Sequence, residues 1–139
     1  MIVDSSVVYA LLDANDRNHE AAAVWYRATV PNLVTTPLIL AEVDHLAGAR
    51  AGKVAQQAWR QDVANDAYDV VWWSGAARQS AAIAERYADL GIGLADASLV
   101  ALAGRLDTVE IATYDERHFR AMRPLSSGAA FRLLPIDAG

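Results

Sequence analysis

Four acidic residues stand where a carboxylate would either be buried or follow the end of a strand. The four acids are Asp4, Glu42, Asp96 and Asp115. Carboxylate oxygens are the ligands that hard cations such as Mg²⁺ and Mn²⁺ prefer in proteins. Because the chain contains no cysteine, disulfides and thiolate metal sites are excluded. The residue types therefore predict a site for Mg²⁺, with Mn²⁺ as a substitute.

Two of the four acids follow apolar strands. Asp4 comes directly after Met1-Ile2-Val3, and Asp115 ends the stretch Ile111-Ala112-Thr113-Tyr114-Asp115. In open α/β sheets, ligands bind beyond the carboxyl ends of the strands. We therefore expect Asp4 and Asp115 to meet at one edge of a sheet.

The other two acids interrupt the apolar stripes of helices. Glu42 lies on the stripe of a helix predicted from residue 37 to about 49, and Asp96 on that of a helix predicted from 94 to about 106. We expect both in first helical turns near the same sheet edge. A carboxylate on a buried stripe needs a charge partner or a metal, and four acids on one edge repel one another unless cations neutralise them.

Each acid also has an ordinary structural explanation. Asp4 alone is most often a helix cap and Asp115 alone a turn residue. Glu42 or Asp96 could each pair with an arginine. These alternatives explain single positions, whereas a metal site explains the set.

The elements between the acids alternate between strands and helices. Strands are predicted at residues 1–4, 33–35, 69–73 (or an extended lead-in there), 110–114 and 131–134. Further helices are predicted from Val7 with Ser5 or Ser6 as cap, through 21–26 with Asn15 or Asp16 as cap, and at 54–64, 76–90 with Ser74 as cap, and 116–122. This order predicts an α/β fold with three layers, in which helices cover a central, mainly parallel sheet. We expect residues 1–139 to form a single domain.

Composition narrows the class of protein. Hydrophobic residues make up 54% of the 139 residues, enough for a sizeable core. No uncharged apolar run reaches the length of a membrane span, and no basic segment leading into an apolar run follows Met1; we expect a cytoplasmic protein without a membrane partner. The net charge of −5 argues against a general nucleic-acid binder with a basic face, although four acids around metal ions would leave the rest nearly balanced.

The motifs around the four acids resemble those of PIN-domain ribonucleases. They are Asp4 after Met-Ile-Val, Glu42 in Ala-Glu-Val, Asp96 in Leu-Ala-Asp-Ala, and Thr113-Tyr114-Asp115 with Phe119. Length and order are similar to those of the VapC toxins of bacterial type II toxin–antitoxin pairs. The resemblance implies a Mg²⁺-dependent endoribonuclease that forms a homodimer and is inhibited by a small cognate antitoxin. It also implies that the hydroxyls of Ser6 and Thr113 support the carboxylates.

The expected reaction is hydrolysis of RNA (tRNA, rRNA or mRNA) by metal-activated water, which leaves 5′-phosphate and 3′-hydroxyl ends. Arg117, Arg120 and Arg123 recur every three residues beside Asp115 and are candidate phosphate contacts; a plain solvated face is the alternative. We expect His118 to be structural or to contact RNA. Two other classes stay open: a metal-dependent phosphoesterase of another α/β family that acts on small substrates, and a non-catalytic interaction domain.

Overall fold

Five short parallel strands form one sheet at the centre of the computed structural model, which describes residues 1–139. The strand order is β3-β2-β1-β4-β5. The strands are β1 (Ile2–Val3), β2 (Val34–Thr35), β3 (Asp69–Val70), β4 (Glu110–Ala112) and β5 (Arg132–Leu134). The predicted α/β fold with a parallel sheet is confirmed.

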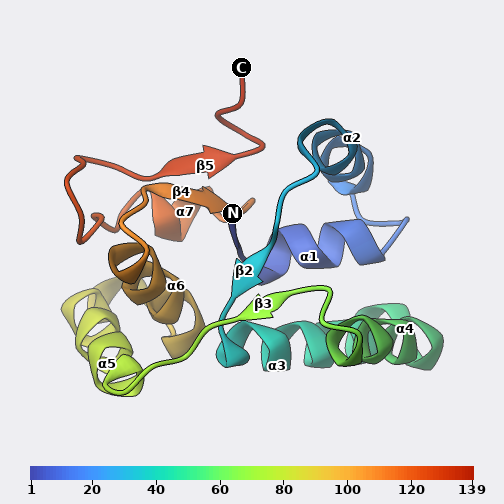
Figure 1. Ribbon diagram of the computed structural model, residues 1–139, viewed down its shortest axis with the longest axis horizontal. Helices are drawn as coiled ribbons and strands as arrows, with labels where there is room; N and C mark the ends of the chain where they lie inside the picture. Colours follow the sequence, from blue (N-terminus) through green and yellow to red (C-terminus); the bar gives the residue numbers. More distant parts are fainter.

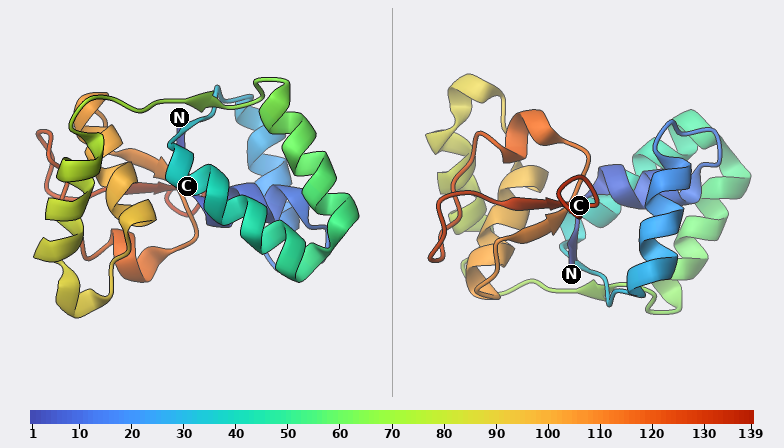
Figure 2. Two further views of the ribbon diagram at one scale, coloured as in Figure 1. Left: turned by 90° about the horizontal axis from the view of Figure 1, so that it is seen from below. Right: turned by 90° about the horizontal axis from the view of Figure 1, so that it is seen from above.

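Six of the seven α-helices flank the sheet in two groups (Figure 1). The first group, α1 to α4, lies on one side of the strands, and α5 and α6 lie on the other; both views of Figure 2 show the same division. The helices are α1 (Ser5–Leu12), α2 (His19–Thr29), α3 (Pro37–Leu46), α4 (Lys53–Ala64), α5 (Ala76–Arg86), α6 (Leu94–Arg105) and the short α7 (Glu116–Phe119).

The central strands are buried on both faces. Val3, Ile111 and Ala112 have no exposed surface, which explains why β1 and β4 read as continuous apolar runs instead of alternating ones. Trp59 from α4 and Phe119 from α7 are among the largest fully buried side chains. No helix has both the length and the apolar character that crossing a bilayer requires.

The register between β1 and β4 determines where the residues that follow these strands lie. Ile2 pairs with Ile111 and Val3 with Ala112 in the parallel β1–β4 ladder. The Asp4 amide then donates to the Ala112 carbonyl at 2.9 Å, so the residues that follow β1 and β4 leave the sheet side by side. This is the edge at which the sequence predicted that Asp4 and Asp115 meet.

The helix caps predicted for α2 and α5 are wrong. Helix α2 begins after Asn18, and neither Asn15 nor Asp16 caps it; the Asp16 carboxylate instead accepts the Asn18 amide at 2.8 Å within the preceding turn. Helix α5 begins after Gly75 instead of Ser74. Gly75 has a φ of 91°, a left-handed conformation that glycine adopts without steric cost.

The end of α3 also differs from the prediction. The α-helical turns stop at Leu46, and the chain continues as one π-helical turn, η1 (Ala47–Ala51), in which the Gly52 amide donates to the Ala47 carbonyl at 2.9 Å. Gly48 therefore lies inside this π-helical turn. Helix α5 is likewise shorter than predicted, because a 3₁₀ turn, η2 (Ala88–Leu90), replaces its last turn.

Candidate active site

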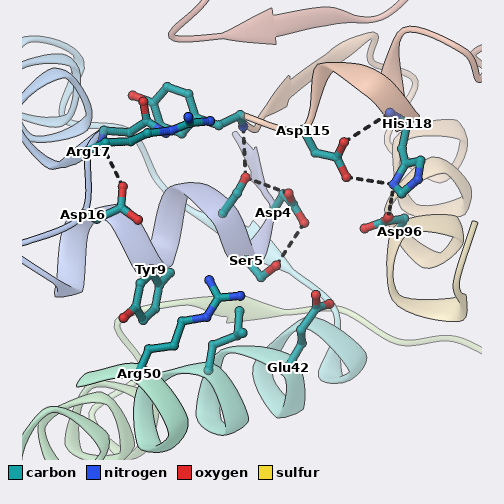
Figure 3. A pocket seen from close by; sticks show the side chains of 14 residues that line it. Asp4, Ser5, Tyr9, Asp16, Arg17, Glu42, Arg50, Asp96, Asp115 and His118 are labelled. Atoms are coloured by element: carbon teal, nitrogen blue, oxygen red, sulfur yellow. Dashed lines mark hydrogen bonds and ion pairs between the residues drawn. The ribbon is translucent and has the colours of Figure 1, made fainter. Parts of the chain in front are cut away.

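The structure brings all four acids to one cavity of about 470 Å³ (Figure 3). Asp4 and Asp115 reach it from the ends of β1 and β4, and Asp96 from the first turn of α6. Glu42 is the sixth residue of α3, so its predicted place in a first turn is wrong. It still faces the cavity, because α3 packs against both α1 and α6.

Asp4 is the most deeply buried of the four acids, with 2% of its surface exposed. Its Oδ2 accepts hydrogen bonds from the hydroxyls of Ser6 and Thr113, each at 2.8 Å, and its Oδ1 accepts a longer one from Ser5 at 3.4 Å. The prediction that Ser5 or Ser6 caps α1 is therefore wrong, because both are the first residues of the helix. Asp4 occupies the N-cap position without a side-chain cap bond.

The hydroxyls of Ser6 and Thr113, which donate to Asp4, also accept hydrogen bonds from the chain beyond β4. Ser6 Oγ accepts the Tyr114 amide and Thr113 Oγ1 accepts the Asp115 amide, both at 2.9 Å. Each hydroxyl therefore donates to a carboxylate and accepts from a backbone amide, which fixes the direction of its single proton. This network ties the loop that carries Asp115 to the end of β1.

Repulsion and burial disfavour ionisation of the cluster. Burial, opposed in part by hydrogen bonds from Thr113 and Ser6, raises the pKa of Asp4. The pKa of Glu42 is raised by burial and then by the charge of Asp4. Burial, followed by the charges of Asp4, Asp115 and Glu42, raises the pKa of Asp96 to about 7. Asp96 is therefore only partly ionised at neutral pH unless a cation offsets the charges around it.

His118 lies between two of the acids, a position that the sequence did not predict. Its Nδ1 is 2.9 Å from Asp115 Oδ2 and 3.3 Å from Asp96 Oδ2. Asp115 caps α7 by accepting the His118 amide at 3.1 Å, so the same residue holds both the backbone and the ring of His118. The available signal was that Asp115 directly precedes a predicted helix and His118 is the third residue of that helix.

The donor set fits a hard divalent cation. Asp96, Asp115 and His118 each offer one ligand atom, and these atoms lie within 4.8 Å of one another. The carboxylates of Asp4 and Glu42 face the same cavity. Mg²⁺ is bound in proteins by a few carboxylates together with waters, and its charge would relieve the repulsion that raises the pKa values.

The fold and the acids point to one protein family, and the comparisons with known proteins identify it. The sequence model of the PIN-domain family matches residues 1–123 of this chain. The chain belongs to the PIN-domain family. It is 37% identical to Ribonuclease VapC26 of Mycobacterium tuberculosis over 136 residues, which cover 97% of this chain and 100% of that protein.

A solved structure shows the same fold. The crystal structure of Mycobacterium tuberculosis VapC20, described there as a sarcin–ricin loop cleaving toxin, superposes with a TM-score of 0.74 at 22% identity and covers 82% of this chain and 88% of that one. The prediction of a VapC-type PIN-domain ribonuclease, and hence of an enzyme, is confirmed. Membership of this family leaves a small-molecule phosphoesterase or a non-catalytic domain without support.

The arginines predicted to contact RNA lie outside the cavity of this PIN domain. Arg117, Arg120 and Arg123 are exposed, and none of them lines it. The Arg120 guanidinium is already paired with Glu116 at 3.0 Å and with Asp137 at 2.8 Å. Their contact with RNA stays a prediction, and for Arg120 it would require exchanging two carboxylates for a phosphate.

Two other arginines do line the cavity of the PIN domain. Arg17, between α1 and α2, and Arg50, in η1, face it together with the acids. The Arg50 Cζ lies 5.8 Å from the centre of the Tyr9 ring. Neither arginine was singled out in the sequence, because neither is close to an acid motif along the chain.

Proposed function

We propose that this VapC-type PIN domain is a Mg²⁺-dependent endoribonuclease toxin. It hydrolyses RNA phosphodiesters with water and leaves 5′-phosphate and 3′-hydroxyl ends. The observation that carries the proposal is the convergence of the four acids in one cavity, where burial, and then the charges of the neighbouring acids, raise the pKa of Asp96 to about 7. Mutual repulsion in such a cluster destabilises the folded protein, and a bound cation would offset that repulsion.

The residues of the cavity have distinct parts in this proposal. Asp96 and Asp115 would hold the cation, and Asp4 and Glu42 would complete the carboxylate set; Mn²⁺ would substitute for Mg²⁺. When bound, Mg²⁺ supplies Lewis acidity that lowers the pKa of water and neutralises charge on the phosphate oxygens. Ser6 and Thr113 position the Asp4 carboxylate through their hydrogen bonds at 2.8 Å.

The substrate is single-stranded or looped RNA. Side chains cannot read the deep, narrow major groove of an RNA duplex, so sequence-specific recognition targets unpaired bases. VapC20, which shares the fold, is described as a sarcin–ricin loop cleaving toxin. We extend that preference for loops, but not the particular target, to this chain.

Partners follow from the same family membership. We propose that residues 1–139 act as one domain, that two copies form a homodimer, and that a small antitoxin inhibits them. A pocket between α1, α2 and the segment that joins α4 to β3 would accept an apolar antitoxin segment. Six of its seven lining residues are hydrophobic, among them Leu11, Leu12, Tyr26, Leu33 and Tyr68. Exposed apolar side chains such as Val30 and Trp72 offer further contact area.

The test is cleavage of RNA by the purified protein, with and without EDTA. Glu42→Gln and Asp115→Asn should each cost more activity than the roughly 10–100-fold that loss of an outer-shell partner costs a metal site. Their melting midpoints in EDTA should stay level or rise, because each substitution relieves repulsion.

The matched control is Asp89→Asn, since Asp89 is exposed in η2 and lies outside the cavity. It should cleave like the parent. Cleavage that persists in EDTA, or equal activity of Asp89→Asn and Asp115→Asn, would refute the metal-dependent function.

A further inference from the structure

Two arginines, together with Asp16, lie on the wall of the cavity opposite Asp96 and His118. Arg17 and Arg50 line it (Figure 3), and neither forms an ion pair with a carboxylate. Other arginines of the chain, such as Arg60 with Asp44, are paired at 2.8 Å. The cavity thus presents free guanidinium groups beside its acids, an arrangement suited to a ligand that carries more than one negative charge.

The π-helical turn η1 determines where Arg50 points. An α-helix advances about 100° per residue, so Arg50, eight residues after Glu42, would lie about 80° around a continuous α-helix from it. A π turn has i→i+5 hydrogen bonds and more residues per turn, which rotates Arg50 back toward the face of Glu42. Glu42, Leu46 and Arg50 accordingly line the same cavity. Turns of this kind often occur at functional sites.

Tyr9 supports the Arg50 side chain. The Arg50 Cζ is 5.8 Å from the centre of the Tyr9 ring, within the range of a cation–π contact. The ring is held in turn, because Tyr9 is 5% exposed and its hydroxyl donates to Asp13. This contact orients the guanidinium without neutralising it, so its N–H donors stay available to an anion.

A backbone phosphate matches these donors. Guanidinium groups bind phosphate oxygens in a bidentate manner, with geometric selectivity that an ammonium group lacks. The phosphate that is cut must lie at the acids, where the cation binds. Arg50 is on the other wall, and Figure 3 shows Arg50 and Tyr9 on the side of the cavity away from Asp96 and His118. The phosphate it could reach is therefore a different one on the same strand.

We propose that Arg50, supported by Tyr9, binds a phosphate of the RNA strand that flanks the one being cut, with Arg17 as a second contact on the same wall. This inference rests on the proposed endoribonuclease function and specifies how its substrate lies: the strand passes from the acids along the wall formed by α1 and η1. Arg50 is then a positioning residue, which binds the substrate without taking part in bond cleavage.

The experiment measures binding of a fluorescein-labelled, single-stranded RNA of mixed sequence in EDTA, over a series of salt concentrations. Compared with the parent, Arg50→Ala should weaken binding about tenfold, as expected for loss of a hydrogen-bonded charge contact. It should also lower the slope of log affinity against log salt by about 0.7, the value for one phosphate contact on a single strand. Arg50→Lys should keep the slope and lose part of the affinity, because a point charge replaces the planar guanidinium.

The matched control is Arg86→Ala, since Arg86 is exposed on α5, away from the cavity. It should bind RNA like the parent. In the cleavage assay with Mg²⁺, Arg50→Ala should raise KM by a factor similar to its loss of affinity and leave kcat within about twofold. The reason is that the lost contact binds the substrate and the transition state equally well.

Binding by Arg50→Ala that equals binding by Arg86→Ala would overturn the inference, and so would a parent protein that does not bind the RNA. The two proposals fail separately. If the parent cleaves RNA with Mg²⁺ and Arg50→Ala matches it in KM and affinity, the endoribonuclease function stands and the phosphate contact falls. If no protein cleaves RNA but Arg50→Ala alone loses affinity and salt dependence, the contact stands and the function falls.

Discussion

Replacing Asp96 by asparagine should stabilise the metal-free protein. The side chain of Asp96 is 17% exposed, and burial followed by the charges of Asp4, Asp115 and Glu42 raises its pKa from 3.8 to about 7. Because the folded-state pKa is raised, this group contributes most stability at low pH, where it is protonated in both states. That contribution is lost as the pH rises from about 4 to about 7.

The size of the effect follows from the same pKa. A rise from 3.8 to about 7 corresponds to about 4 kcal/mol at neutral pH, at 1.36 kcal/mol for each tenfold change in the proton equilibrium. This is an upper limit, because the other acids can take up protons and His118 loses one of its two carboxylate neighbours. A net gain of roughly 1–3 kcal/mol remains, or about 3–10 °C in melting midpoint for a domain of this size.

The assay is thermal unfolding of Asp96→Asn and parent in EDTA between pH 4 and pH 8, repeated with Mg²⁺. The difference between the two midpoints should be smallest near pH 4 and grow toward pH 7. Mg²⁺ should raise the midpoint of the parent, because a ligand that binds only the folded state stabilises it, and should leave Asp96→Asn almost unchanged. A variant that is less stable than the parent in EDTA at pH 7, or that responds equally to Mg²⁺, would refute the reasoning.

Three other predictions follow from the hydrogen bonds and exposed surface. Thr113→Val removes the donor to Asp4 and the acceptor of the Asp115 amide; calorimetry should show about 10–100-fold weaker Mg²⁺ binding, and unchanged affinity would contradict the positioning role. Tyr114→Phe removes a buried hydroxyl that has no hydrogen-bond partner, so chemical denaturation should show a gain of up to about 1 kcal/mol; a clear loss would reveal an unrecognised partner. Sedimentation should show a dimer at micromolar concentration, because apolar side chains such as Trp72 are 40% exposed, and a monomer throughout would count against it.

The sequence predicted the parallel sheet and the convergence of the four acids in one cavity, because both have strong local signals. The strands β1 and β4 read as apolar runs that end in a carboxylate, and a parallel sheet places such ends at one edge. Asp96 interrupts the apolar face of a helix, and this pattern indicates a buried acid whichever element that face packs against. These patterns depend on neighbouring residues alone, so no tertiary information is needed to find them.

Other features of the site depend on contacts between distant segments. The π-helical turn that rotates Arg50 has only Ala, Gly and Arg in its sequence, Ala47–Ala51, and these residues carry no periodic signal for it. His118 was visible three residues after Asp115, but its contact with Asp96 exists only once α6 and α7 are placed. Asp137, which pairs with the Arg120 guanidinium, lies 17 residues further along the chain.

Helix caps were the least predictable local feature. Ser5, Ser6 and Asp4 are all good capping types, and the structure uses the two hydroxyls to bind the Asp4 carboxylate. A serine that caps a helix and one that supports a buried acid have the same sequence signature. The two roles can be told apart only in the structure, where Thr113, directly after β4, donates to the same Asp4 Oδ2 as Ser6 does.

The central claim is that water, activated at the four acids, cuts the RNA backbone. Analysis of the end groups of RNA fragments tests it most directly, using purified protein, a structured RNA with exposed loops, and Mg²⁺. Hydrolysis by water should leave 5′-phosphate and 3′-hydroxyl ends, with no product in EDTA, because the ribose hydroxyl is not the nucleophile. Fragments that end in a 2′,3′-cyclic phosphate would show attack by the ribose and contradict the account.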